Sequence, residues 1–150
     1  MAEMHRLKNQ TIVFTNGCFD LLHLGHITYL AQAASLGDKL FVAVNDDASV
    51  RALEKGENRP INPELARAIV LAALGVVDHV ILFSEDTPLN TILAIKPDLI
   101  VKGGDYDAAL SDPTDKRYIV GKNEAEVWGG SAQTIPLVEG YSTTGLLAKR

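Results

Sequence analysis

The feature that most constrains this chain is a regular alternation along its length. Short runs of apolar, often β-branched residues alternate with segments whose apolar residues recur at helical spacing. The runs predict strands at residues 11–15, 40–45, 79–83, 98–101 and 132–135. The intervening segments predict helices at residues 27–34, 48–53, 64–74, 87–95 and 120–128, with a last helix in the tail. Such alternation predicts a parallel α/β sheet with helices on both faces, in a single domain spanning residues 1–150.

One of these helices also carries a prediction about its buried side. In residues 64–74 the apolar side chains recur at a spacing that places them on one face of a helix. We therefore expect that face to pack against the sheet. Its members are Leu65, Ile69, Ala72 and Ala73.

Composition excludes several classes of protein. Fourteen basic residues against nineteen acidic ones give a net charge of −5, which argues against a broad nucleic-acid-binding face. No apolar run approaches the ~20 residues that a membrane-spanning helix needs, and the first ten residues do not resemble a signal peptide. Cys18 is the single cysteine, so no intrachain disulfide can form. We therefore expect a cytoplasmic protein that binds neither membranes nor nucleic acid.

The unusual residues cluster where strands are expected to end. Open parallel sheets bind ligands beyond the carboxyl ends of their strands, near the point where the strand order reverses. The clusters follow the strands that end near residues 15 and 101, and one precedes the final helix. We therefore expect one site at that edge of the sheet.

The first cluster is the stretch Gly17-Cys18-Phe19-Asp20-Leu21-Leu22-His23-Leu24-Gly25-His26. His23 and His26 are three residues apart at a helix start, so they lie near one face. Free backbone N–H groups and neutral imidazoles can together bind an anion, and phosphate is the natural candidate. For an isolated pair of this kind, capping and packing are the favoured explanation. A zinc site is a weaker interpretation, because no third ligand accompanies the pair.

Three further clusters permit both a structural and a functional interpretation. Hydroxyls at Ser142, Thr143 and Thr144, after Tyr141, suit either a helix cap or a phosphate site. Lys102 and Gly103 precede Asp105, which suits either a plain turn or contacts with a phosphate and a ribose. The loop with Lys55 and Arg59, together with Arg67 on the next helix, is either a solvated surface or a clamp over a triphosphate.

Other catalytic signatures are missing from the sequence. It contains no G-x-x-x-x-G-K-[ST] loop, no G-x-G-x-x-G fingerprint and no G-x-S-x-G elbow. Cys18 could act as a nucleophile, but its apolar neighbours favour a small buried side chain.

The combination resembles a known family. A strand followed by G-x-F-D-x-x-H-x-G-H, with a late S-T-T at a helix start, resembles the nucleotidyltransferases of the cytidylyltransferase type. The stretches TNGCFDLLHLGHITYL, KGENRPINP, VKGGDY and GYSTT follow in the expected order over nearly the whole chain. These motifs are most similar to those of the heptose 1-phosphate adenylyltransferase branch, which we would expect here as a stand-alone chain. The resemblance implies a Rossmann-like fold and a reaction of ATP with D-glycero-D-manno-heptose 1-phosphate, giving ADP-heptose and pyrophosphate for the lipopolysaccharide inner core.

The resemblance also implies roles for individual residues. His23 and His26 would contact the nucleotide phosphates, and Lys55 would be a mobile phosphate-binding lysine. Asn16, Gly17, Cys18 and Phe19 would form the loop against the nucleotide. Ser142, Thr143 and Thr144 would hold the β- and γ-phosphates, and Asp105 would face the ribose. It further implies Mg²⁺, whose ligands stay unassigned, and a homodimer with Arg67 near its interface.

Two departures from the family pattern keep alternatives open. Glycerol-phosphate cytidylyltransferases carry an arginine shortly before S-T-T, whereas this chain has Leu137-Val138-Glu139-Gly140. Glu54 looks like an extra residue before Lys55, so the assignment of Lys55 could shift. The alternatives are a CTP-dependent enzyme acting on glycerol 3-phosphate or another small phosphate, and a non-catalytic nucleotide-binding domain. Residues 102–117, which are polar and rich in turns, are a candidate lid over the acceptor.

Overall fold

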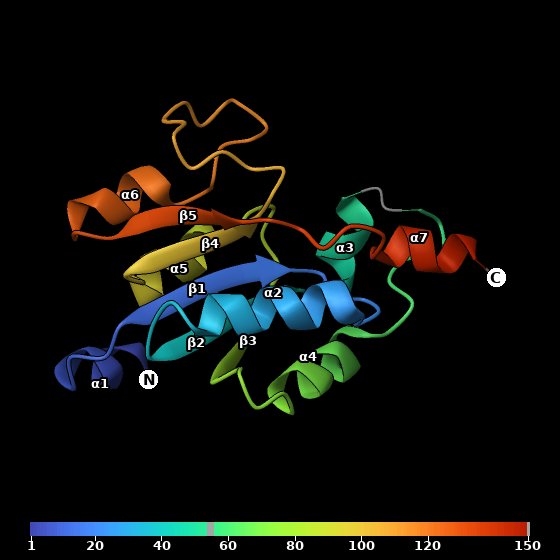
Figure 1. Cartoon of the computed structure of the whole chain (residues 1–150), viewed down its shortest axis with the longest axis horizontal. Coiled ribbons are helices and arrows are strands. Elements are labelled where there is room, and N and C mark those ends of the chain that lie inside the picture. Colours follow the sequence, from blue (N-terminus) through green and yellow to red (C-terminus); the bar gives the residue numbers. More distant parts are fainter. Residues whose placement is uncertain (54–55, 150) are drawn as a thin grey trace.

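Five strands form a single sheet in this computed structural model, which describes residues 1–53 and 56–149. The strands are β1 (Ile12–Gly17), β2 (Lys39–Asn45), β3 (His79–Phe83), β4 (Leu99–Gly103) and β5 (Ser131–Ile135). The helices are α1 (Ala2–Leu7), α2 (Leu24–Ala34), α3 (Asp47–Ala52), α4 (Glu64–Ala72), α5 (Leu89–Ile95), α6 (Lys122–Val127) and α7 (Thr143–Ala148). Every strand pairing is parallel, in the order β3-β2-β1-β4-β5 (Figure 1). The expected Rossmann-like α/β sheet is confirmed.

Both faces of the sheet are buried, which explains why its strands read as unbroken apolar runs. On β1, Val13 points into one core together with residues of α2 and α4. Its neighbours Ile12 and Phe14 point into a second core with residues of α5 and α6. Figure 1 shows α2 crossing one face of the sheet while α5 lies behind it. The two cores therefore hold the central strand rigidly from both sides.

The strand order reverses direction at β1. β2 and then β3 lie on one side of β1, and the chain returns to its other side to form β4 and β5. The carboxyl ends of β1 and β4 are consequently neighbours from which the following segments diverge. In sheets of this kind a crevice opens at that point.

Helix α4 is rotated relative to our prediction. The expected inner residues Leu65, Ile69, Ala72 and Ala73 are all exposed, and Arg67 and Leu71 are buried instead. Beneath the helix, the guanidinium of Arg67 donates hydrogen bonds to carbonyl and carboxylate oxygens from separate segments of the chain. Because a buried cation is stable only when such partners surround it, these acceptors set which face of α4 turns inward.

Helix α1 was not expected from the sequence. It buries one side chain, His5, whose Nδ1 lies 2.6 Å from Oε1 of Gln10 and whose Nε2 lies 2.8 Å from Nε2 of His79. Because this helix docks through a histidine, its sequence has no apolar stripe from which a helix could be predicted. In the described part of the chain no helix is long and apolar enough to cross a membrane.

The segment between β4 and α6 was expected to be a candidate lid. Its first residues, Lys102 and Gly103, belong to β4. Further along, Lys122 and Asn123 of α6 donate side-chain hydrogen bonds to the carbonyls of Leu110 and Ser111. Arg117 O also accepts from the backbone N–H of Asp107. The two side-chain contacts tie the middle of the segment to α6, and the backbone contact closes the segment on itself.

Candidate active site

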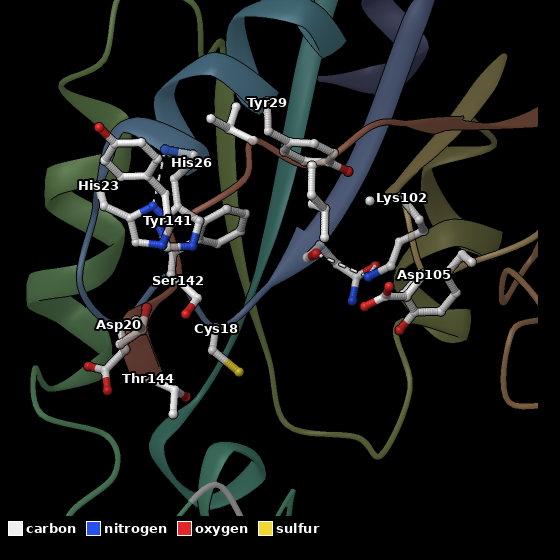
Figure 2. A pocket seen from close by; sticks show the side chains of 18 of the residues that line it. Cys18, Asp20, His23, His26, Tyr29, Lys102, Asp105, Tyr141, Ser142 and Thr144 are labelled. Carbon is white, nitrogen blue, oxygen red and sulfur yellow. Dashed lines mark hydrogen bonds between the residues drawn. The ribbon is translucent and has the colours of Figure 1, made fainter. Parts of the chain in front are cut away.

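A cavity of about 480 Å³ lies at the crevice between the carboxyl ends of β1 and β4. Figure 2 shows His23, His26, Ser142 and Thr144 on one side of it and Lys102 with Asp105 on the other. Segments far apart in the chain therefore meet here: the loop after β1, the first turns of α2, the end of β4 and the stretch before α7. The lining residues are Asn16, Cys18, Phe19, Asp20, His23, Gly25, His26, Tyr29, Arg59, Lys102, Gly103, Asp105, Tyr106, Leu137, Val138, Tyr141, Ser142, Thr143 and Thr144.

The start of α2 fixes both histidines. His23 is the N-cap of the helix, and its Nδ1 accepts a hydrogen bond of 3.1 Å from the backbone N–H of Gly25. The His23 and His26 rings stack with centroids 3.9 Å apart. A Cβ on Gly25 would lie 2.9 Å from the His23 ring, so glycine is needed for this close approach. Capping and stacking together hold two imidazoles at the mouth of the cavity.

The hydrogen bond to His23 also determines its protonation. Because Nδ1 accepts, the neutral ring carries its proton on Nε2. Burial lowers the pKa of His23 below its usual value of 6.5. His23 is therefore an uncharged donor near neutral pH, suited to binding an anion through N–H.

The opposite side of the cavity joins β1 to β4. Lys102 Nζ donates to the backbone carbonyl and the Oδ1 of Asn16, at 3.3 and 3.2 Å. The same ammonium lies 4.9 Å from the centre of the Tyr106 ring, and Asp105 is exposed beside it. This arrangement holds a cation at the reversal point of the sheet.

Tyr29 stabilises that point from below. Its hydroxyl donates to the carbonyl of Val101 at 2.9 Å and lies 2.6 Å from the hydroxyl of Thr15. Burial is the main cause of a raised pKa for this phenol, which therefore stays protonated. Tyr29 thus links α2, β1 and β4 at the floor of the cavity.

The start of α7 closes the cavity on its outer side. Ser142 is the N-cap, and its hydroxyl accepts from the Gly145 N–H at 2.9 Å. Thr143 donates to the carbonyl of Leu21 at 3.5 Å, which connects α7 to the loop after β1. The capping interpretation is therefore confirmed for Ser142. Because the Ser142 oxygen only accepts in this cap, its hydroxyl proton can still be donated to a ligand.

A buried ion pair ties the loop after α3 to the loop after β1. Asp20 Oδ2 accepts from Arg59 Nε at 2.7 Å, and its carboxylate also accepts from the backbone N–H groups of Ile61 and Asn62. Burial alone would raise the pKa of Asp20, but these hydrogen bonds outweigh it and hold the pKa below its usual value. Asp20 is therefore ionised at neutral pH.

A second, smaller cavity of about 260 Å³ adjoins the first. Asn16, Lys102 and Tyr106 line both cavities, so they form a shared wall. The rest of its lining comes from the carboxyl ends of β2 and β3 and the residues that follow them. These residues are Asn45, Leu53, Phe83, Asp86, Thr87 and Pro88, with Val120.

Comparison with known proteins identifies the family to which the chain belongs. A family model described as cytidylyltransferase-like matches residues 14–147, which is most of the chain. The chain belongs to the cytidylyltransferase-like family. Membership indicates a nucleotidyltransferase.

The relatives narrow the comparison further. The domain is 53% identical over 144 residues to the bifunctional protein HldE of Koribacter versatilis, covering 96% of this chain and 28% of that protein. It is 51% identical to the HldE of Pseudomonas entomophila with the same coverage. A crystal structure of a lipopolysaccharide core biosynthesis protein from Thermoplasma volcanium aligns with a TM-score of 0.66 and 32% identity, covering 89% of this chain and 99% of that one. The chain thus spans under a third of the length of the HldE relatives.

Most residues that we expected in the site of the cytidylyltransferase-like domain do line the first cavity. Gly17 does not line it, but a Cβ there would lie 3.0 Å from the Phe19 ring. Lys55 lies outside the described residues. Cys18 lines the cavity with an almost buried side chain. The other expected residues that line it are Asn16, Phe19, His23, His26, Arg59, Lys102, Gly103, Asp105, Tyr141, Ser142, Thr143 and Thr144.

Arg67 is the exception that corrects our prediction. We expected it to bind the substrate, but it is only 2% exposed and does not line the cavity. Its expected place near a dimer interface stays a prediction. Its guanidinium is bonded to Asn62 O, Cys18 O, Asn45 O and Asp47. With these donors engaged by protein oxygens, Arg67 holds together the segments beneath the site and does not reach the cavity.

Sequence reasoning missed several lining residues. Asp20 stood inside the recognised motif but received no role, because its partners come from a loop about forty residues away. Tyr29 lies one turn beyond His26, a spacing that could have placed it on the same face. Tyr106 stood inside the quoted stretch VKGGDY but received no role. Leu137 and Val138 carry no local signal, since only the fold brings them to the cavity.

The lowered pKa of His23 predicts how stability depends on pH. The unfolded chain binds a proton on this ring more readily than the folded chain does, so the free energy of unfolding should fall as the pH drops below about 6.5. His79, whose pKa is also lowered, chiefly by burial, adds to the same trend. In His23→Asn, which retains a capping side chain, the loss of stability on acidification should be smaller. Urea unfolding at several pH values measures this, and an unchanged pH dependence in the variant would contradict it.

Proposed function

We propose that this chain transfers AMP from ATP to D-glycero-D-manno-heptose 1-phosphate, giving ADP-heptose and pyrophosphate for the lipopolysaccharide inner core. The observation that carries the proposal is the crevice itself, where stacked His23 and His26 face Lys102 across one cavity. The resemblance to heptose 1-phosphate adenylyltransferases, the HldE relatives and the neighbour from lipopolysaccharide core biosynthesis support this choice of substrate. Because the reaction uses ATP and the lone cysteine suits a reducing compartment, we propose a cytoplasmic location.

In this proposal the nucleotide occupies the first cavity. Leu137 and Val138 give one part of its lining an apolar character that suits a base, and Asp105 lies beside Lys102 where it could accept from a ribose hydroxyl. Imidazole and hydroxyl donors gather at the α2 and α7 side, which suits phosphate oxygens. The triphosphate would therefore extend toward His23, His26 and Ser142.

The sugar phosphate occupies the second cavity. Asn45, Asp86 and Thr87 offer side-chain oxygens and an amide to a molecule rich in hydroxyl groups. The wall shared with the first cavity contains Lys102 and Asn16, so the acceptor phosphate can approach the nucleotide there. Lys102 is then positioned to offset the repulsion between the two anions.

The chemistry needs no general base. One ionised oxygen of the sugar phosphate forms a bond to the α-phosphorus, and the bond from that phosphorus to the oxygen bridging to the β-phosphate breaks. Pyrophosphate leaves with that electron pair, and no proton has to move. The residues therefore act by orienting two anions in line and by donating hydrogen bonds to the charge that develops.

In this proposal Mg²⁺ enters the site bound to the phosphates of the nucleotide. The residues that the structure describes contain no cluster of three or more histidine, cysteine or carboxylate side chains that could hold a metal ion. Mg²⁺ commonly keeps several waters and binds through substrate phosphates with few protein carboxylates. It would neutralise phosphate charge. Among the lining carboxylates, Asp105 is exposed at the cavity and could bind the ion, whereas Asp20 is already engaged by its own partners.

The choice of nucleotide is tested by pyrophosphate release with Mg²⁺ and heptose 1-phosphate. We expect release with ATP and little with CTP, GTP or UTP run in parallel. Release with CTP, above all with glycerol 3-phosphate as the acceptor, would favour the cytidylyltransferase alternative. Nucleotide binding without release from any pair would favour a non-catalytic domain and overturn the proposal.

His26 is expected to contribute to the rate rather than to the fold. In His26→Ala, pyrophosphate release should slow by about 10²–10³-fold or more, because a hydrogen-bond donor to the transferring phosphates is lost. Circular dichroism should show an unchanged fold. Turnover close to that of the wild type would contradict the role that we propose for this histidine.

We also propose that two copies of the chain pair through α4. Its outward side chains Leu65 and Ile69 are 64% and 60% exposed one turn apart, and α4 packs beside β3, an edge strand of the sheet. A patch that pairs with the same patch on a second copy forms a closed two-fold dimer, as the family resemblance implies.

Size-exclusion chromatography with light scattering tests this pairing. The wild type should have about twice the 16.2 kDa of one chain, and Leu65→Glu with Ile69→Glu should halve the mass. Val127→Glu is the matched control, because Val127 is 88% exposed on α6 beside the opposite edge strand β5. A monomeric wild type would contradict the pairing.

A further inference from the structure

Arg59 is a buried cation whose guanidinium has hydrogen-bond donors without a partner among the described residues. Its side chain is 8% exposed and its Nε donates to Asp20, whose own side chain is fully buried. Within the described residues, Nη1 and Nη2 of Arg59 have no hydrogen-bond partner. A guanidinium has five N–H donors, and burying it without partners for them is costly. Because Arg59 lines the first cavity, the unused donors are available to a ligand there.

Asp20 holds the backbone that carries Arg59 as well as its side chain. Its carboxylate accepts from the N–H groups of Ile61 and Asn62 at 2.8–2.9 Å, and its carbonyl accepts from Asn62 Nδ2 at 2.7 Å. Asp20 lies three residues before His23, within the loop that leads from β1 into α2. The loop carrying Arg59 is thereby fastened next to the histidines.

The linings of the two cavities indicate which ligand Arg59 would contact. Lys102 and Asn16 line both cavities, whereas Arg59 lines only the first. Figure 2 shows its partner Asp20 close to Thr144, on the side away from Lys102 and Asp105. The stretch before Ser142 contributes Leu137 and Val138 to the lining, and neither is a cation. Among the lining residues that the structure describes, Arg59 is therefore the cation on the side of the cavity opposite the acceptor.

We propose that Asp20 positions Arg59 so that Nη1 and Nη2 bind the β- and γ-phosphates of the nucleoside triphosphate, the part that leaves as pyrophosphate. This inference rests on the proposed function, to which it adds the residue that distinguishes a triphosphate from a monophosphate. A guanidinium presents two parallel donors that match two phosphate oxygens. Arg59 touches the leaving group, and Asp20 is a positioning residue that acts through it.

Calorimetric binding of ATP, AMP and pyrophosphate to the full chain tests the assignment. In Arg59→Gln the affinities for ATP and pyrophosphate should fall about 10- to 100-fold, while that for AMP should change less than about twofold. Arg59→Lys should show an intermediate loss, because an ammonium keeps the charge without the fork. Lys8→Gln is the control for net charge, since Lys8 is exposed just after α1, away from the cavity, and it should leave every affinity unchanged.

Asp20 is tested by the preference for ATP over AMP. Asp20→Asn should reduce this preference, and adding Arg59→Gln to it should reduce it no further, because both changes remove the same contact. A merely structural role for Asp20 would instead lower both affinities together and add to the effect of Arg59→Gln. If Asp20→Asn does not fold, the two Arg59 variants decide the proposal alone.

The outcomes separate this inference from the function on which it rests. If the wild type binds CTP and CMP in place of ATP and AMP, the proposed nucleotide is wrong and the same comparison is made with that pair. If the wild type binds no nucleotide, both proposals fail. If the wild type binds ATP and Arg59→Gln binds it equally well, or loses AMP to the same extent, only this inference is overturned.

Discussion

The buried guanidinium of Arg67 is the interaction on which the site depends. It donates to the carbonyls of Cys18, Asn45 and Asn62 and to the carboxylate of Asp47. These oxygens belong to the loop after β1, the end of β2, the start of α3 and the approach to α4. A buried cation is tolerated only with partners of this quality, and removing them would leave an uncompensated charge. One side chain that lies outside the cavity therefore fixes the relative positions of segments that line it.

The parts of the fold that could be predicted are those determined by burial on a single element. The strands were found because both faces of the sheet are covered, so each strand reads as an apolar run. The orientation of α4 could not be predicted, because the oxygens that attract Arg67 come from residues distant in sequence. Helix α1 was missed for a related reason, since it docks through the hydrogen bond between His5 and His79 rather than through an apolar stripe.

The same distinction applies to the site. His23, His26 and Ser142 stand at the starts of helices within short motifs, and a motif is visible without a structure. Asp20 belongs to the sequence motif, but its role could not be predicted from it. Its hydrogen bonds to Arg59, Ile61 and Asn62 form only when two loops meet in the folded chain. Leu137 and Val138 reach the cavity because β5 lies beside β4, which is a property of strand order alone.

The first cavity draws its lining from segments near residues 20, 59, 102 and 142, which the unfolded chain does not hold together. A ligand of this cavity consequently binds the folded state and not the unfolded one. By mass action it stabilises the fold by about 2.7 kcal/mol at a free concentration one hundred times its dissociation constant. For this chain, thermal stability is itself a measure of occupancy, because the separation of those segments in sequence makes ligand binding and folding a single linked equilibrium.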